Sequence, residues 1–237
     1  MPDYLHSDPV PILSENDSQL VCVKAPGLLS EDHPSLPCLP VLLKQHTGAP
    51  VYPVHRLDKE TGGVMVYAKT PREAARLSKI IQEGNMVKEY LAILCGEPQD
   101  DTGEWEDLLF HDRAKNKTYT VKRERRGVKP ARLAYRKLDV KNRHTLVQIR
   151  LYTGRTHQIR AQSAARKMPL LGDRRYGGEA APGLGLWAFR LTLPGGHVFT
   201  ALPPCEGVWL PFADTLKALE STALPYQTEP LPAESRK

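Results

Sequence analysis

Residues 55–63 read HRLDKETGG, a segment that places one carboxylate, Asp58, between basic neighbours and a pair of glycines. The residues that follow, 63–69, are β-prone, so they predict a strand that begins where the polar segment ends. Catalytic groups often sit on loops that rigid elements hold in place. An aspartate near a turn is also common without any catalytic role, so the surrounding sequence has to distinguish the two interpretations.

The clearest local signal follows this strand. A Thr-Pro-x-Glu box at residues 70–73 supplies a hydroxyl at the N-cap, proline at N1 and glutamate at N3, which predicts the start of a helix. Apolar residues at helical spacing continue to Ile81, and Gly84 is placed to end the helix in a left-handed conformation. Residues 86–94 then predict a mostly buried strand.

The remaining segments indicate an α+β fold. Strands are expected near residues 21–24, 147–151, 186–193 and 197–202, and helices near 39–46, 156–167 (capped by Thr156) and 212–221. Residues 98–132 are polar and basic, and we expect hairpins and loops there rather than core. The irregular order of strands and helices favours α+β over a regularly alternating parallel sheet.

Composition excludes several classes. The 237 residues are 41% hydrophobic and 25% charged, as in ordinary globular chains. No apolar run approaches the roughly 18 to 20 residues of a membrane helix, and no leader pattern is present at the N-terminus, so we expect a cytoplasmic protein without membrane contact. Cys22, Cys38, Cys95 and Cys205 form no Cys-x-x-Cys pair and have no histidine at a metal-ligand interval, so reduced thiols and no metal are expected.

Positive charge is concentrated in one part of the chain. Residues 113–175 hold 20 of the 33 lysines and arginines but only three acids, a net charge of +17, while the remaining residues together carry −11. Such a segregated field attracts a polyanion, and nucleic acid is the obvious one. Bases between residues 113 and 132 lie in a segment with little core, so an RNA-gripping hairpin is plausible there. A solvated basic face without a ligand has the same pattern.

Several blocks, in order, resemble the RluA-type RNA pseudouridine synthases over roughly residues 15–205. They are KAPG at 24–27, HRLD at 55–58 with Thr61-Gly62-Gly63 behind it, KEYLA at 88–92, TGRTHQIR at 153–160 and PLLGDRRYG at 169–177. The first block departs from the family's Lys-Pro-x-Gly because Ala25 follows the lysine. A second departure is Gly62, where the family commonly has serine.

The resemblance implies a pseudouridine synthase-like fold, with a mixed, mainly antiparallel sheet, flanking helices and a central catalytic cleft. It implies an N-terminal extension at 1–14, a catalytic domain at 15–222 and a disordered tail at 223–237. The short segment before the first strand leaves no room for an S4-type RNA-binding domain. The implied activity converts uridine in structured ribosomal or transfer RNA to pseudouridine without a cofactor or metal. The sequence does not reveal the oligomeric state, and a monomer is the default expectation.

The resemblance also assigns roles to individual residues. Asp58 acts on the ribose, either as nucleophile at C1′ or as base at C2′, and Arg155 is the candidate guanidinium that pairs with it. Tyr90 stacks on the flipped uracil. Arg56 enters the space that the flipped base vacates, where a planar guanidinium can stack or hold phosphate. A phosphate contact at the start of a helix is the alternative for Arg155.

Five further residues complete the expected substrate-binding set. Leu170 or Leu171 is expected to form the apolar wall of the pocket, although either also suits the core. His55 and His157 are expected to have structural or RNA-contact roles rather than to transfer protons, because the family's chemistry rests on one carboxylate. Thr61, directly behind the reactive loop, is the fifth.

Two other functions remain open. A catalytically inactive RNA-binding protein of the same fold would show the same charge asymmetry, but it would not require the set of Asp58, Tyr90 and Arg155. A hydrolase, either a nuclease that uses the two histidines or a glycosidase, is the second alternative. Glycosidases generally use two carboxylates, and Glu60 would point away from Asp58 in an extended segment.

Overall fold

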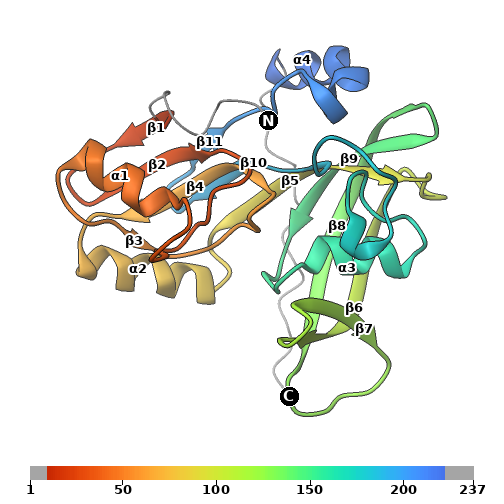
Figure 1. Cartoon of the computed structure of the whole chain (residues 1–237), viewed down its shortest axis with the longest axis horizontal. Helices are drawn as coiled ribbons and strands as arrows, with labels where there is room; N and C mark the ends of the chain where they lie inside the picture. Colours follow the sequence, from red (N-terminus) through yellow and green to blue (C-terminus); the bar gives the residue numbers. More distant parts are fainter. Residues whose placement is uncertain (1–9, 222–237) are drawn as a thin grey trace.

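Eleven strands form one curved sheet in the computed structural model, which describes residues 10–221 (Figure 1). The strands are β1 (Ile12–Glu15), β2 (Gln19–Lys24), β3 (Tyr52–Pro53), β4 (Gly62–Ala68), β5 (Val87–Cys95), β6 (Thr102–Asp112), β7 (Lys117–Val121), β8 (Val128–Lys141), β9 (His144–Leu151), β10 (Leu186–Leu193) and β11 (His197–Thr200). The α-helices within this range are α1 (Leu39–Thr47), α2 (Pro71–Gln82), α3 (Gln158–Ala165) and α4 (Ala213–Ser221). Short 3₁₀ helices occur at η1 (Arg174–Tyr176) and η2 (Gly207–Phe212).

The sheet consists of two halves that meet at β4 and β10. Its order is β1-β2-β4-β10-β5-β9-β8-β6-β7, with β11 on β10 and β3 on β4. Each pairing is antiparallel except that of β10 with β4, which is parallel and joins only Trp187 to Gly62 and Ala188 to Gly63. Figure 1 shows α1 and α2 on one half and α3 on the other. The expected α+β class with a mainly antiparallel sheet is confirmed.

Two glycines permit the close approach of these halves. Gly63 has a φ of +121°, and a β-carbon there would lie 2.2 Å from the carbonyl oxygen of Ala188. A β-carbon on Gly62 would lie 2.2 Å from the indole ring of Trp187. The departure from serine at position 62 therefore has a steric cause, since the indole occupies the space that a side chain would need.

The helix predicted from the capping box is confirmed. The Thr70 hydroxyl accepts a hydrogen bond from the backbone N–H of Glu73 at 3.2 Å, and α2 begins at Pro71. Gly84 has a φ of +75°, as expected for a left-handed helix end. The predicted cap of α3 is wrong. His157, not Thr156, is the N-cap, with a φ of 53° and no side-chain capping bond.

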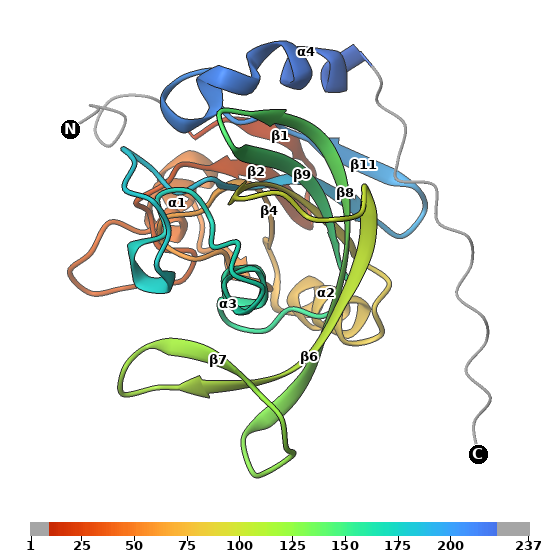
Figure 2. The same cartoon turned by 90° about the vertical axis from the view of Figure 1, so that its right-hand side faces the viewer.

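The expectation of little core in residues 98–132 is also wrong in part. Trp105 and Leu109 on β6, and Ala131 on β8, are buried. β6 and β8 are long strands. One end of each contributes to the buried part of the sheet, and the other end extends beyond it. Figure 2 shows β6 and β7 reaching away from the rest of the molecule on the side where α3 lies.

The boundaries of the folded unit differ slightly from those expected. β1 pairs with β2 from Ile12 onward, so the sheet begins inside the expected extension 1–14. The predicted tail 223–237 lies outside the described residues. Among residues 10–221, no helix has both the length and the apolar character needed to cross a membrane.

The two faces of the sheet bury different partners. On one face, Tyr90 of β5 and Ile149 of β9 share a cluster with Ile159 of α3. On the opposite face, Leu91 and Ile93 of β5 pack with residues of η2 and α4. α3 is therefore held against the face that carries Tyr90.

Candidate active site

The loop that carries Asp58 is fixed by hydrogen bonds on both sides. The Ser30 hydroxyl accepts from the backbone N–H of Leu57 at 3.0 Å and donates to the Leu57 carbonyl at 3.1 Å. The backbone N–H of Thr61 donates to the Asp58 carbonyl at 3.0 Å, which closes the turn before β4. These contacts leave the Asp58 side chain 19% exposed and directed into a cavity.

Lys24 supports the same loop through contacts of its ammonium group with backbone carbonyls. Its ammonium group is fully buried and donates to the backbone carbonyls of Leu28 at 2.8 Å and of Ala25 and Lys59 at 3.1 Å each. Burial lowers the pKa of Lys24 to about 8, although the charge of Asp58 acts in the opposite direction. The KAPG block, including its extra Ala25, is thus a structural support for the reactive loop.

Arg160 of α3 is the cation that faces Asp58. One terminal nitrogen of its guanidinium donates to Asp58 Oδ2 at 3.1 Å, and the other two nitrogens form a bidentate pair with Asp173 at 2.7 and 2.8 Å. Burial opposes the charge on Arg160, but the hydrogen bonds to Asp173 and the charges of both carboxylates raise its pKa above the ordinary value. The guanidinium is therefore permanently charged and rigidly aimed at Asp58.

The expectation that Arg155 pairs with Asp58 is wrong. Its Nε donates to the backbone carbonyl of Pro130 at 2.9 Å, although its side chain lines the same cavity. Arg160 belongs to the same TGRTHQIR block, and composition cannot choose between two arginines five residues apart. The start of α3 was the available signal, because a helix beginning near residue 158 carries Arg160 in its first turn, whereas Arg155 remains in the preceding loop.

His157 completes the surroundings of the carboxylate. Its Nε2 lies 3.7 Å from Asp58 Oδ2, and its Nδ1 is 3.1 Å from the Tyr176 hydroxyl. Burial lowers the pKa of His157, and the charge of Arg160 adds to this effect while Asp58 opposes it. A neutral imidazole held between two partners is consistent with the structural role expected for His157.

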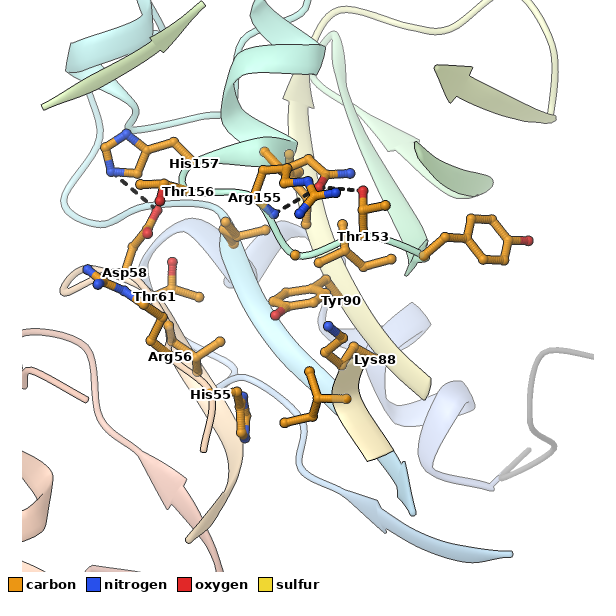
Figure 3. Close-up of a pocket in the computed structure, with 18 of the residues that line it drawn as sticks. His55, Arg56, Asp58, Thr61, Lys88, Tyr90, Thr153, Arg155, Thr156 and His157 are labelled. Carbon is orange, nitrogen blue, oxygen red and sulfur yellow. Dashed lines mark hydrogen bonds and ion pairs between the residues drawn. The ribbon is translucent and has the colours of Figure 1, made fainter. Parts of the chain in front are cut away.

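Tyr90 lies on β5 across the cavity from Asp58 (Figure 3). It is 8% exposed. Burial raises the pKa of its hydroxyl above the ordinary value, and the charge of Asp58 adds to this effect. The phenol is therefore neutral around pH 7, and its ring lies beside the space that Asp58 faces.

These groups share one cavity of about 660 Å³, the size of a small-ligand site. It lies between the halves of the sheet, and its aliphatic lining includes Ile81, Leu151 and Leu186. Leu170 and Leu171, the expected apolar wall, do not line it. Leu170 is fully buried in the core, and the backbone N–H of Leu171 donates to the Ile93 carbonyl at 2.9 Å, which places this segment beside the last residues of β5.

Arg56 lies at the rim of this cavity, whereas Thr61 is buried inside it. The Arg56 side chain is 64% exposed at the rim and pairs with Glu31, itself 55% exposed, at 3.1 Å. An exposed pair of this kind contributes little stability, so the guanidinium can exchange partners easily. Thr61 is buried beside Asp58, and its hydroxyl has no hydrogen-bond partner among the described residues.

His55 has a structural contact. Its Nε2 accepts a hydrogen bond from the backbone N–H of Val66 at 3.1 Å, which ties the reactive loop to β4. Burial lowers the pKa of His55 to about 3, and the nearby charge of Lys88 adds to this effect. The imidazole therefore stays neutral in the folded protein at physiological pH.

This histidine predicts a loss of stability in acid. Its pKa falls from 6.5 to about 3 on folding, so between these values the unfolded chain binds the extra proton, and stability decreases as pH falls. The slope approaches about 1.4 kcal/mol per pH unit. His55→Gln keeps an acceptor for Val66 but cannot titrate. Urea unfolding at pH 7.5 and 4.5 should show that wild type loses about 1–3 kcal/mol more than the variant; equal losses would contradict this.

One group of potential metal ligands occurs among the described residues. Donor atoms of Cys95, His144 and Glu179 lie within 4.8 Å of one another. Sequence spacing did not reveal them because Cys95 and His144 face each other on neighbouring strands, β5 and β9. They lie at the end of β9 opposite the cavity, so an ion there would not contact Asp58.

Comparison with known proteins supplies independent findings. Residues 19–165 match the family model described as RNA pseudouridylate synthase. The chain is 40% identical over 131 residues to ribosomal large subunit pseudouridine synthase D of Vibrio parahaemolyticus, covering 54% of this chain and 38% of that protein. It is 34% identical over 185 residues to the Yersinia pestis protein of the same name, covering 73% of this chain and 54% of that protein. The matched part is therefore only about half the length of these relatives, or less.

A solved structure agrees in fold. Human RNA pseudouridylate synthase domain containing 4 superimposes with a TM-score of 0.71 at 26% identity, covering 87% of this chain and 93% of that chain. Because the superposition covers 87% of this chain, the similarity in fold extends over both halves of the sheet.

Proposed function

Because this chain belongs to the RNA pseudouridylate synthase family, we propose that it converts uridine in RNA to pseudouridine with Asp58 as the reactive carboxylate. One observation carries the proposal: Asp58, its cation Arg160 and the ring of Tyr90 face a single cavity, although they come from separate segments of the chain. A carboxylate, a fixed positive charge and an aromatic surface are the groups that this isomerisation requires.

The reaction breaks the bond from N1 of uracil to C1′ of ribose and forms a bond from C5 to C1′. Asp58 either attacks C1′ or removes the proton at C2′; both routes need a carboxylate close to the sugar. The uracil turns on the face of Tyr90, where stacking contributes about 1–3 kcal/mol. When C5 bonds to C1′, the Asp58 ester is displaced or the C2′ proton is returned, which frees the carboxylate. C5 then loses its proton to water and N1 takes up a proton, so no atom is gained or lost overall. Arg160 supplies a positive charge opposite Asp58 without donating a proton itself.

The substrate uridine must leave its stack to reach Asp58. Flipping a base costs a few kcal/mol, and the vacated space has to be filled. Arg56 is suited to this task because it lies at the rim, is mostly exposed and, within residues 10–221, pairs only with Glu31. A planar guanidinium can stack on bases and contact phosphate at once.

We propose ribosomal RNA as the substrate class. The support is the name of the two bacterial relatives, which specifies the large ribosomal subunit, together with the positive charge of residues 113–175. Transfer RNA is the alternative. The monomeric state and cytoplasmic location remain predictions that accompany this proposal.

Tritium release tests the activity. RNA transcripts of the large ribosomal subunit and a transfer RNA pool, both labelled with 5-tritiated uridine, would be incubated with the full chain. We expect tritium in the water from ribosomal RNA, equal in amount to the pseudouridine formed, with intact strands and no free uracil. Release from neither RNA would contradict the proposal, and strand breaks or free uracil would indicate a hydrolase.

A further inference from the structure

The cavity has a second positive pole on the wall away from Asp58. We propose that Lys88 and Arg155 form a clamp for a phosphate of the RNA backbone next to the flipped uridine. The inference rests on the proposed function, since it concerns the same RNA in the same cavity. It gives a role to a lysine that the sequence did not single out and reassigns Arg155 from the carboxylate to the backbone.

The Lys88 side chain enters the cavity and has no polar partner in the part of the chain that the structure describes. It is partly buried and lines the cavity, and no hydrogen bond or ion pair of its ammonium group occurs among residues 10–221. The amine lies against the 153–155 turn, since a β-carbon placed on Gly154 would be 3.3 Å from it. Its pKa is lowered by burial and further by the charge of Arg155. Burying an unpaired cation is costly unless a ligand compensates for it.

Arg155 stands beside this lysine and is held in place. Its Nε is engaged by the Pro130 carbonyl at 2.9 Å, and within the described part of the chain its two terminal nitrogens make no hydrogen bond or ion pair. The two carboxylates that line the cavity are already paired, Asp58 with Arg160 and Glu31 with Arg56. Two neighbouring cations without an intervening acid repel each other, and a bound anion would remove that repulsion.

Strand geometry favours phosphate over the base as the occupant. Lys88 and Tyr90 are two residues apart on β5, so they share a face about 6.5–7 Å apart along the strand. Tyr90 is the platform for the base, and Lys88 is nearer the start of the strand and more exposed than Tyr90. A separation of this size matches the offset between a nucleobase and the backbone that carries it. Figure 3 shows both side chains, with Arg155, around the same space.

A neighbouring cavity continues the path of positive charge. It has a volume of about 700 Å³ and shares Gly154, Arg155 and Thr156 with the first cavity. Arg113, Arg126 and Lys129 from β6–β8 also line it. Arg155 therefore stands where a backbone leaving the clamp would enter a second basic groove beneath the β6–β7 hairpin.

Neutral phosphate linkages test the clamp directly. A series of short RNAs spanning the modified uridine would carry a single methylphosphonate at each flanking position in turn. For wild type, one linkage should lower kcat/KM about 10- to 100-fold, as expected for a charge-assisted hydrogen bond. Lys88→Met should show a loss of this size with natural RNA but no further loss at that linkage. Lys88→Arg should recover part of the activity, and Arg155→Met should resemble Lys88→Met.

Lys217→Met is the matched control, because Lys217 is an exposed lysine of α4, which packs on the face of the sheet opposite Tyr90. This variant should behave as wild type. Activity of Lys88→Met within twofold of wild type would overturn the clamp. The clamp would also be overturned if Lys88→Met lost as much further activity as wild type at each neutral linkage. That result would indicate that Lys88 contacts the base instead. If wild type forms no pseudouridine, the proposed function fails, and affinities for the same RNAs decide the clamp separately. Equal melting temperatures exclude a folding defect.

Discussion

An Asp58→Asn variant is expected to form pseudouridine at least about 10⁴-fold more slowly than wild type, as when a reacting group is removed from an enzyme. The amide has nearly the shape of the carboxylate but can neither attack C1′ nor accept a proton from C2′. Initial rates of tritium release measure the effect.

The fold of this variant should be intact. The amide oxygen can still accept from Arg160, and Asp173 continues to neutralise the guanidinium through its two short hydrogen bonds. We therefore expect the unfolding free energy to change by about 1 kcal/mol or less and the affinity for RNA to stay within about threefold of wild type. Retained binding with lost turnover separates a catalytic role from a binding role.

Glu60→Gln is the matched control. The Glu60 carboxylate lies 4.0 Å from Arg160 but is 61% exposed, and a mechanism with one reacting carboxylate does not use it. Its activity should match that of wild type. Equal tritium release from wild type and Asp58→Asn would exclude the proposed chemistry, whereas a comparable loss in Glu60→Gln would favour a pair of carboxylates and hence a glycosidase.

An Arg160→Met variant should lose both stability and activity. Asp173, whose side chain is fully buried, would keep its carboxylate without a cation, and breaking a buried pair in this way costs about 3–5 kcal/mol. Asp58 would lose the guanidinium 3.1 Å away, so kcat should fall by roughly 10²-fold or more. Urea unfolding and tritium release measure the two effects.

A second substitution separates these effects. In Arg160→Met/Asp173→Asn the buried charge is also removed, so part of the stability should return while the activity stays low. Arg166→Met, at the C-cap of α3, breaks a partly exposed pair with Asp107 and should cost only about 1 kcal/mol. Recovery of activity together with stability in the double variant would mean that Arg160 acts only on the fold.

Sequence patterns predicted much of the secondary structure because their signals are local. The Thr70 cap, Gly84 and the alternation around Val147 each depend on neighbours within a few residues. The hairpins predicted for residues 98–132 are present, since β6 pairs antiparallel with β7 and β8. The expectation of little core there failed because charge and low hydrophobicity suggested that these residues would not be buried. β6 and β8 are strands whose polar side chains face solvent along most of their length, so only a few positions, such as Trp105 and Leu109, record burial.

In the candidate site, too, local features could be predicted and long-range contacts could not. The reactive loop could be located because several of its groups are adjacent in the chain. The partner of Asp58 could not, because the choice between Arg155 and Arg160 depends on where α3 begins and how it packs. Leu170 was misplaced for a similar reason: a leucine in a motif has the same composition whether it faces a cavity or the core.

The contact between Asp58 and Arg160 joins residues 102 positions apart. Closing a loop of that length carries a large entropic cost, which only the completed sheet can offset. A chain emerging from the ribosome with residue 160 still in the exit tunnel would hold its aspartate but not the cation that faces it. The ability to modify RNA should therefore appear late in synthesis and in a single step, with no partly active fragment preceding it.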